Sequence, residues 1–113
     1  MDQIVDALMA LGDRTKLMVL GPVASQKKGT HKKLLEELRK EGYVRVRVDG
    51  QVISLSDEIE LEKNKKHTIE VVVDRIVIKE GIVRRLTDSV EEALKLGDGL
   101  MVGAVVGGND YLF

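Results

Sequence analysis

Cysteine is absent from this 113-residue chain, and aromatic residues are few. Without cysteine, the chain forms no disulfide, no thiolate zinc site and no cysteine nucleophile. Its aromatic residues are Tyr43, Tyr111 and Phe113, too few for a base-stacking platform that would bind single-stranded nucleic acid. Hydrophobic residues still make up 43% of the chain, so we expect an aliphatic core.

Long apolar runs and catalytic motifs are also missing. No run approaches the ~20 apolar residues that a transmembrane helix needs. There is no GxxxxGK[ST] phosphate loop, and the glycines at 97–99 and 103–108 predict turns, because they lack the strand–turn–helix context of a dinucleotide site. His31 and His67 each stand alone among lysines, without the spacing of a metal site. We therefore expect no catalytic residue, no metal site and no cofactor in these residues.

Charge is unevenly distributed, although the formal net charge is only −1. Residues 14–47 hold ten Lys or Arg against three Asp or Glu, a balance of +7. Residues 88–113 hold five acidic residues against one lysine, a balance of −4. A basic region of this kind can steer a charged partner even when the total charge is near zero.

Apolar periodicity and capping residues predict three helices. These cover residues 2–11, a segment from a Thr30 cap to Gly42, and a segment from caps at 87–89 to Gly97. Strands are expected at 16–24, 67–79 and 100–106, with a polar loop at 25–29 and an exposed excursion at 56–66. The alternation in 67–79 is imperfect, which indicates either two partly covered faces or a bulge near Asp74. The order of elements predicts one α+β domain, a mainly antiparallel sheet with a central hairpin and three helices packed on it.

The hairpin at residues 43–54 is the clearest local pattern. Asp49–Gly50 is typical of a two-residue type I′ turn, because both positions tolerate positive φ. That turn pairs Val46 with Ile53 and places two arginines on the face opposite the aliphatic residues. The predicted buried side consists of Val44, Val46, Ile53 and Leu55.

Two sets of basic residues are candidates for binding. Arginines on or beside strands favour planar, bidentate recognition of carboxylate or phosphate, and the alternative is pairing within the chain with Glu58, Glu60 or Glu70. The arginines are Arg45, Arg47, Arg75, Arg84 and Arg85. The second set, Lys27, Lys28, Lys32 and Lys33, either is simply solvated or attracts phosphate.

Three segments resemble the UvrA family, the damage-recognition ATPases of bacterial nucleotide excision repair. They are residues 32–50 (KKLLEELRKEGYVRVRVDG), 61–75 (LEKNKKHTIEVVVDR) and 74–100 (DRIVIKEGIVRRLTDSVEEALKLGDGL), in the family's own order. The region that they resemble is the UvrB-interacting domain, inserted in the first ATP-binding half. Residues 24–30 depart from the family, whose members tend to carry an arginine-containing stretch there.

The resemblance implies that residues 1–113 are a single docking domain of a cytoplasmic protein that binds UvrB and helps to load it at DNA lesions. It implies that the family's ATP and zinc sites lie outside these residues, that the domain itself is not an enzyme, and that alone it is a monomer. We expect Arg45, Arg75 and Arg85 to contact carboxylates on UvrB, with Arg47 and Arg84 as neighbours. The alternative is direct contact between the basic half and the DNA backbone.

Overall fold

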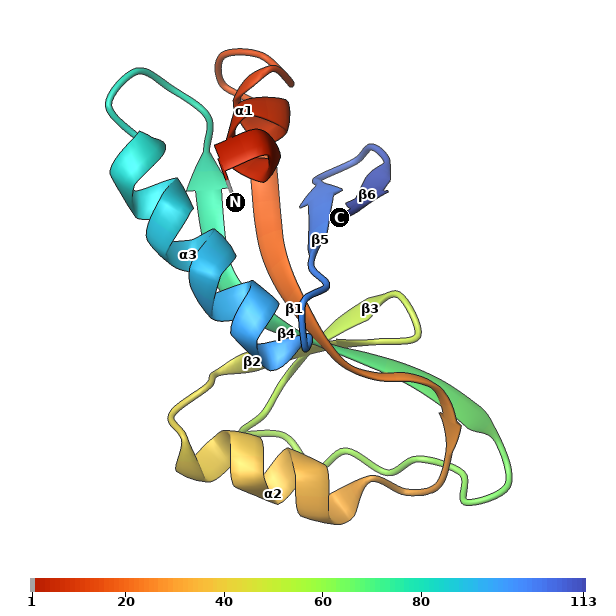
Figure 1. Cartoon of the computed structure of the whole chain (residues 1–113). Coiled ribbons are helices and arrows are strands. Elements are labelled where there is room, and N and C mark those ends of the chain that lie inside the picture. The colour runs from red at the N-terminus through yellow and green to blue at the C-terminus, as the bar shows by residue number, and fades with distance from the viewer. Residues whose placement is uncertain (1) are drawn as a thin grey trace.

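Two long antiparallel strands, β1 (Lys16–Lys28) and β4 (Lys66–Val77), run through the whole computed structural model, which describes residues 2–113 (Figure 1). Over these residues the sheet has six strands in the order β3-β2-β4-β1-β5-β6, and every neighbouring pair is antiparallel. The shorter strands are β2 (Arg45–Val48), β3 (Gln51–Ser54), β5 (Val102–Val105) and β6 (Asp110–Leu112). The helices are α1 (Asp2–Met9), α2 (Lys32–Lys40) and α3 (Val83–Leu96). The predicted α+β class is confirmed.

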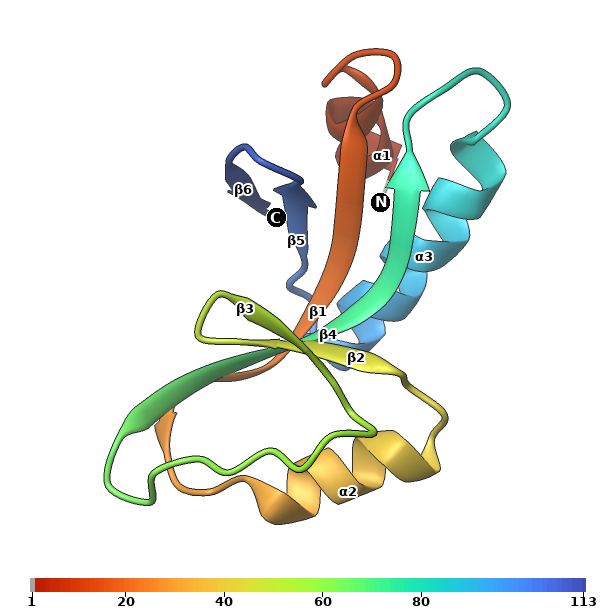
Figure 2. The same cartoon turned by 180° about the vertical axis from the view of Figure 1, so that it is seen from behind.

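Buried aliphatic side chains form two main clusters, one at each end of the long strands. Helices α1 and α3 cover the first cluster, and α2 covers the second beneath the β2–β3 hairpin (Figure 2). Leu8, Leu86 and Ile76 are typical of the first cluster, and Leu35 and Val46 of the second. The molecule is accordingly elongated, with extents of 43 × 26 × 24 Å.

Strand β4 carries a β-bulge, as its irregular alternation predicts near Asp74. While β1 advances one residue, from Val19 to Leu20, β4 passes Val73 as an extra residue. The bulge changes which positions are buried. Before it the odd-numbered residues Ile69 and Val71 are buried, and after it the even-numbered residues Ile76 and Ile78 are buried. The side chain of Arg75 therefore lies on the face away from the α1–α3 cluster, where it is exposed.

The predicted hairpin register is confirmed. Val46 pairs with Ile53, and the turn residues Asp49 and Gly50 have φ of 50° and 87°. Val44 is an exception to the predicted buried face, because it is 58% exposed. It precedes β2, and its carbonyl accepts a hydrogen bond from the Leu55 backbone N–H at 2.8 Å, so the pairing extends to Val44 although its side chain faces solvent.

Three sequence predictions about element boundaries are wrong. The expected loop at 25–29 is largely strand, because β1 continues to Lys28 against the start of β4. Helix α2 begins after His31, which has φ of 54°, so Thr30 is not its cap. Helix α3 begins at Val83, before the expected caps: Thr87 instead donates to the carbonyl of Val83, one turn earlier in the same helix.

Close packing of α3 on β1 depends on Gly21, where a Cβ would lie 2.8 Å from Leu96 Cβ.

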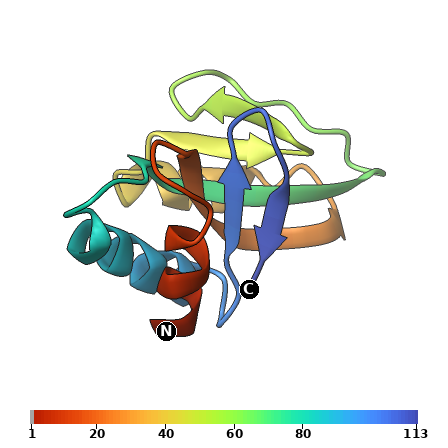
Figure 3. The same cartoon turned by 90° about the horizontal axis from the view of Figure 1, so that it is seen from above.

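The sheet curls, and its face away from the helices encloses a small third cluster. Leu20, Val102 and Ala104 are buried there, with Met18 and Val72 packed against them. Viewed from above, the β5–β6 hairpin lies across the direction of β2 and β4 (Figure 3). The curl brings β6 against β2 although three strands lie between them in the sheet order, and Arg47 of β2 contacts Asp110 of β6. Strands far apart in the ladder thereby contribute to one surface.

Candidate functional site: an arginine-lined hollow

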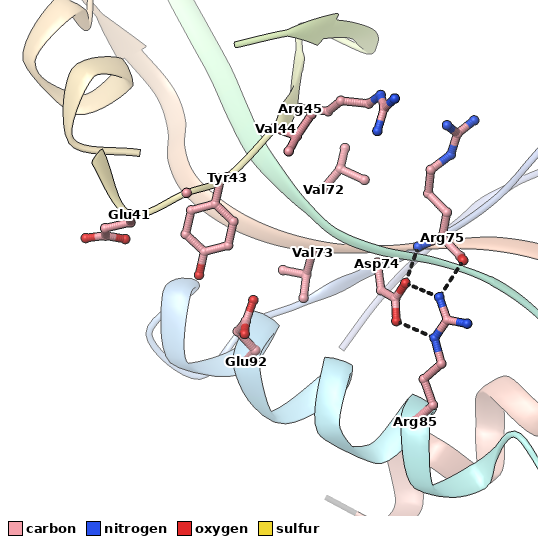
Figure 4. Close-up of a pocket in the computed structure, with 11 residues that line it drawn as sticks. Glu41, Tyr43, Val44, Arg45, Val72, Val73, Asp74, Arg75, Arg85 and Glu92 are labelled. Carbon is pink, nitrogen blue, oxygen red and sulfur yellow. Dashed lines mark hydrogen bonds and ion pairs between the residues drawn. The ribbon is translucent and has the colours of Figure 1, made fainter. Parts of the chain in front are cut away.

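An open hollow of about 540 Å³ lies where the segment after α2 meets β4 and α3 (Figure 4). The structure brings Arg45, Arg75 and Arg85 together on its wall, although they come from three different elements. The remaining walls are formed by Glu41, Gly42, Tyr43, Val44, Val72, Val73, Asp74 and Glu92. We call this surface the arginine hollow. It combines cationic, anionic and apolar groups.

Arg85 is held in place by Asp74. Its guanidinium donates to the Asp74 carboxylate through Nε at 3.0 Å and Nη2 at 2.7 Å, and Ser89 Oγ donates to the same carboxylate at 2.7 Å. Burial by itself would raise the pKa of Asp74, but the hydrogen bonds from Arg85, Ser89 and the Arg75 backbone N–H hold that pKa below its ordinary value. Asp74 therefore stays ionised and fixes one side of the hollow.

Arg45 and Arg75 differ from Arg85 because neither forms an ion pair with any of the described side chains, which are those of residues 3–113. Both side chains are exposed, and Figure 4 shows their guanidinium groups extending to the same side of the sheet. Each has all five N–H donors available. Together they can receive two carboxylates, or one carboxylate from two directions.

Apolar surface lies directly beside these arginines. Val44 is exposed and Tyr43 half-buried, and both line the hollow. Burial raises the pKa of the Tyr43 phenol, and the neighbouring Glu92 carboxylate raises it further. Tyr43 is therefore a neutral hydroxyl near pH 7. An aromatic residue with a polar tip beside free arginines is the composition found at the centre of protein–protein interfaces.

Arg47 has a structural role, and its prediction as an accessible site residue does not match its position. Its guanidinium donates to Glu70 at 2.8 and 2.9 Å and to Asp110 at 3.0 and 2.8 Å, and its side chain is only 11% exposed. Hydrogen bonding to Glu70 raises the pKa of Arg47 despite the opposing effect of burial. We call Arg47, Glu70 and Asp110 the carboxylate clasp. For this arginine, the alternative of pairing with Glu70 inside the chain is the one observed.

The other predicted site residues lie outside the hollow. Arg84 is exposed on α3, but unlike Arg85 it does not line the hollow. The lysines Lys27, Lys28, Lys32 and Lys33 are exposed at the end of β1 and the start of α2. Because Tyr43 follows α2 and Lys32 begins it, the length of that helix separates the two charged surfaces.

His67 is buried and makes no metal-like cluster. Its Nδ1 lies 2.7 Å from an Asp49 carboxylate oxygen and its Nε2 lies 3.1 Å from the Glu62 carbonyl oxygen. Both partners accept hydrogen bonds, so they favour the doubly protonated ring, and hydrogen bonding to Asp49 raises the pKa of His67. Across residues 2–113, no three His, Asp or Glu side chains gather as a metal ion would require.

Residues 1–106 match the family model described as the UvrA interaction domain. The chain belongs to this family. Among curated relatives, UvrABC system protein A of Bacillus subtilis is 56% identical over 112 residues, and that of Clostridium acetobutylicum is 58% identical over 113 residues. The protein of the same name from Listeria innocua is 54% identical over 112 residues. Each alignment covers 99% of this chain and 12% of the relative.

This UvrA interaction domain spans about an eighth of the length of these relatives. The resemblance stated from the three segments is confirmed. No helix among residues 2–113 is long and apolar enough to cross a membrane.

Sequence reasoning missed several residues of the arginine hollow. Asp74 carries no motif, and only the packing of α3 against β4 brings it beside Arg85. Glu92 lies seven residues after Arg85 on α3 and lines the hollow together with Tyr43. Asp110 was likewise missed as a partner of Arg47, since it lies 63 residues away. The missing information is long-range pairing, which no local pattern supplies.

Proposed function

We propose that this domain docks UvrB through the arginine hollow, without catalysing a reaction itself. The observation that carries the proposal is the pair Arg45 and Arg75, two exposed arginines without ion-pair partners among the side chains of residues 3–113, next to the exposed side chain of Val44. The family description, an interaction domain of UvrA, supports a protein as the partner. UvrB is the partner that the resemblance implies.

The chemistry of the hollow favours a partner surface that presents carboxylates around an apolar residue. Arginine pairs bidentately with a carboxylate, and such pairs gain strength when the interface excludes water. Val44 and Tyr43 supply the apolar area that excludes it. Arg85, held by Asp74 yet 59% exposed, adds the N–H donors of its Nη1 in a fixed position.

The proposal is tested by titrating UvrB into the Arg75→Glu variant of this chain and measuring affinity by calorimetry. Removing the charge and introducing repulsion at a desolvated pair should cost about 2–5 kcal/mol of binding free energy. The matched control is Arg14→Glu, the same charge change at a side chain that is 89% exposed and does not line the hollow. It should leave affinity nearly unchanged.

Two outcomes would count against the arginine hollow. Equal affinities of Arg75→Glu and the unsubstituted chain would exclude Arg75 from the interface. A loss of UvrB binding on substituting Lys27 and Lys28, with the triple Arg→Glu variant at 45, 75 and 85 still binding, would move the docking surface to the other end of α2.

A further inference from the structure

A second charged surface lies at the end of α2 opposite the arginine hollow, and we propose that it binds the phosphate backbone of duplex nucleic acid. We define the lysine end as five exposed side chains from three elements: Lys27 and Lys28 of β1, Lys32 and Lys33 of α2, and Lys66 of β4. The end of β1, the start of α2 and the start of β4 meet in the lower half of Figure 1. None of the five forms an ion pair with a side chain of residues 3–113.

The first observation is a pair of like charges in the sheet. Lys28 and Lys66 are direct partners in the β1–β4 ladder. Like charges placed directly opposite each other in an antiparallel pair destabilise the sheet. The neighbouring acidic side chain Glu62 pairs with Lys65 at 3.3 Å and not with either of these two lysines. An anion bound between Lys28 and Lys66 would turn this repulsion into attraction.

A second pair of lysines is also placed where positive charge is unfavourable. Lys32 and Lys33 occupy the first turn of α2, which contains no acidic residue. The amino end of a helix carries partial positive charge and favours anions, so two cations there are also unfavourable for the isolated fold. The hydrogen bond between His31 Nε2 and the Lys27 carbonyl oxygen, 3.0 Å, holds this helix end beside β1. Two independent elements thus bring lysines to one place, and of these only Lys32 also borders a hollow that Glu36, Glu58 and Glu60 line.

The composition of the lysine end favours phosphate over a protein partner. The five lysines lie in segments 25–33 and 61–67. Among the described residues, neither segment contains an exposed large hydrophobic side chain, so this surface has no apolar centre. Lysine acts as a hydrated point charge suited to phosphate oxygens, whereas the arginine hollow uses planar forks. No Phe, Tyr or Trp lies in either segment, and the rings of His31 and His67 pack edge-to-face against each other at a centroid distance of 6.3 Å, which favours a duplex backbone over stacked single-stranded bases.

The test measures binding of this chain alone to a labelled duplex of about 20 base pairs by fluorescence anisotropy, over about 50–200 mM salt. Each neutralised phosphate contributes about −0.9 to the slope of log affinity against log salt. Lys28→Gln with Lys66→Gln should weaken binding and make the slope shallower by about 2. The control, Lys16→Gln with Lys79→Gln, makes the same charge change at the start of β1 and just after the end of β4, far from the lysine end, and should leave the slope unchanged.

Because UvrB is absent from this assay, its result is independent of the proposed docking function. Equal slopes for the two double variants would overturn the proposal, as would tighter binding of a single strand than of the duplex. A loss of UvrB affinity in the Lys28/Lys66 variant with duplex binding intact would make the lysine end a protein surface instead. If circular dichroism shows that this variant is unfolded, Lys32→Gln with Lys33→Gln gives the same test on α2, again with a predicted loss of about 2 in slope.

Discussion

The carboxylate clasp and the arginine hollow share one strand of the hairpin, yet their arginines have opposite roles. Arg45 and Arg47 lie two residues apart on the same face of β2. Arg47 contacts Glu70 and Asp110 and is nearly buried, whereas Arg45 is exposed and forms no ion pair with the carboxylates of residues 3–113. The difference shows that strand face and residue type do not decide whether an arginine holds the fold or is available to a partner. The role of an arginine depends on whether the folded sheet places carboxylates beside it.

The largest expected effect in this comparison comes from breaking the clasp. Arg47→Met leaves Glu70, whose side chain is 7% exposed, as an unpaired buried charge and should cost about 3–5 kcal/mol of unfolding free energy. Urea unfolding followed by circular dichroism measures the loss. Arg47→Met with Glu70→Met removes both charges and should recover a large part of it. If the single variant were as stable as the unsubstituted chain, the clasp would not support the fold.

A smaller effect is expected at the turn that positions both arginines. Gly50 has φ of 87°, and valine there is strained, so Gly50→Val should destabilise the domain by about 1–2 kcal/mol. The space around a Cβ at this position is open, so the cost arises from backbone conformation and not from a clash. Gly50→Asn, which tolerates positive φ, is the matched control and should cost less. Equal losses for valine and asparagine would contradict this explanation.

The smallest expected effect is the pH dependence contributed by His67. Its raised pKa means that protonated His67 stabilises the fold fully below about 6.5, and that this contribution disappears as pH rises through the raised value. The difference in unfolding free energy between the unsubstituted chain and His67→Asn should therefore be larger at about pH 5.5 than at about pH 9. Chemical unfolding at the two pH values measures it, and a constant difference would exclude a charged His67.

Local features of this chain were predictable from its sequence, and features that depend on distant pairing were not. The hairpin register follows from Asp49–Gly50 and the alternation around it, because turn and strands are contiguous. The extension of β1 to Lys28 depends on β4, because Lys66, the first residue of β4, pairs with Lys28 in the β1–β4 ladder. The sequence of 25–29 by itself has the polarity of a loop.

The start of α3 and the roles of the arginines show the same limit. Ser89 looks like a helix cap, but inside α3 its hydroxyl donates to Asp74, a residue of another element. Capping preference alone therefore favours a later start of helix α3, and tertiary packing overrides that preference. Arg45 and Arg47 are both predicted to contact a partner, but Arg47 pairs with Glu70, its neighbour across the β2–β4 ladder, and with Asp110, which reaches β2 only because the sheet curls.

The most direct test of the central claim is a calorimetric titration of UvrB into the Arg45→Ala/Arg75→Ala double variant, with the thermal unfolding of the same sample recorded. These side chains are exposed and form no ion pair with the side chains of residues 3–113, so the melting temperature should stay within about 2 °C of the unsubstituted chain. Affinity for UvrB should fall at least about tenfold, which corresponds to about 1.4 kcal/mol. Unchanged affinity, or a loss of affinity that appears only together with a lower melting temperature, would contradict the division between an arginine pair that docks and an arginine clasp that holds the fold.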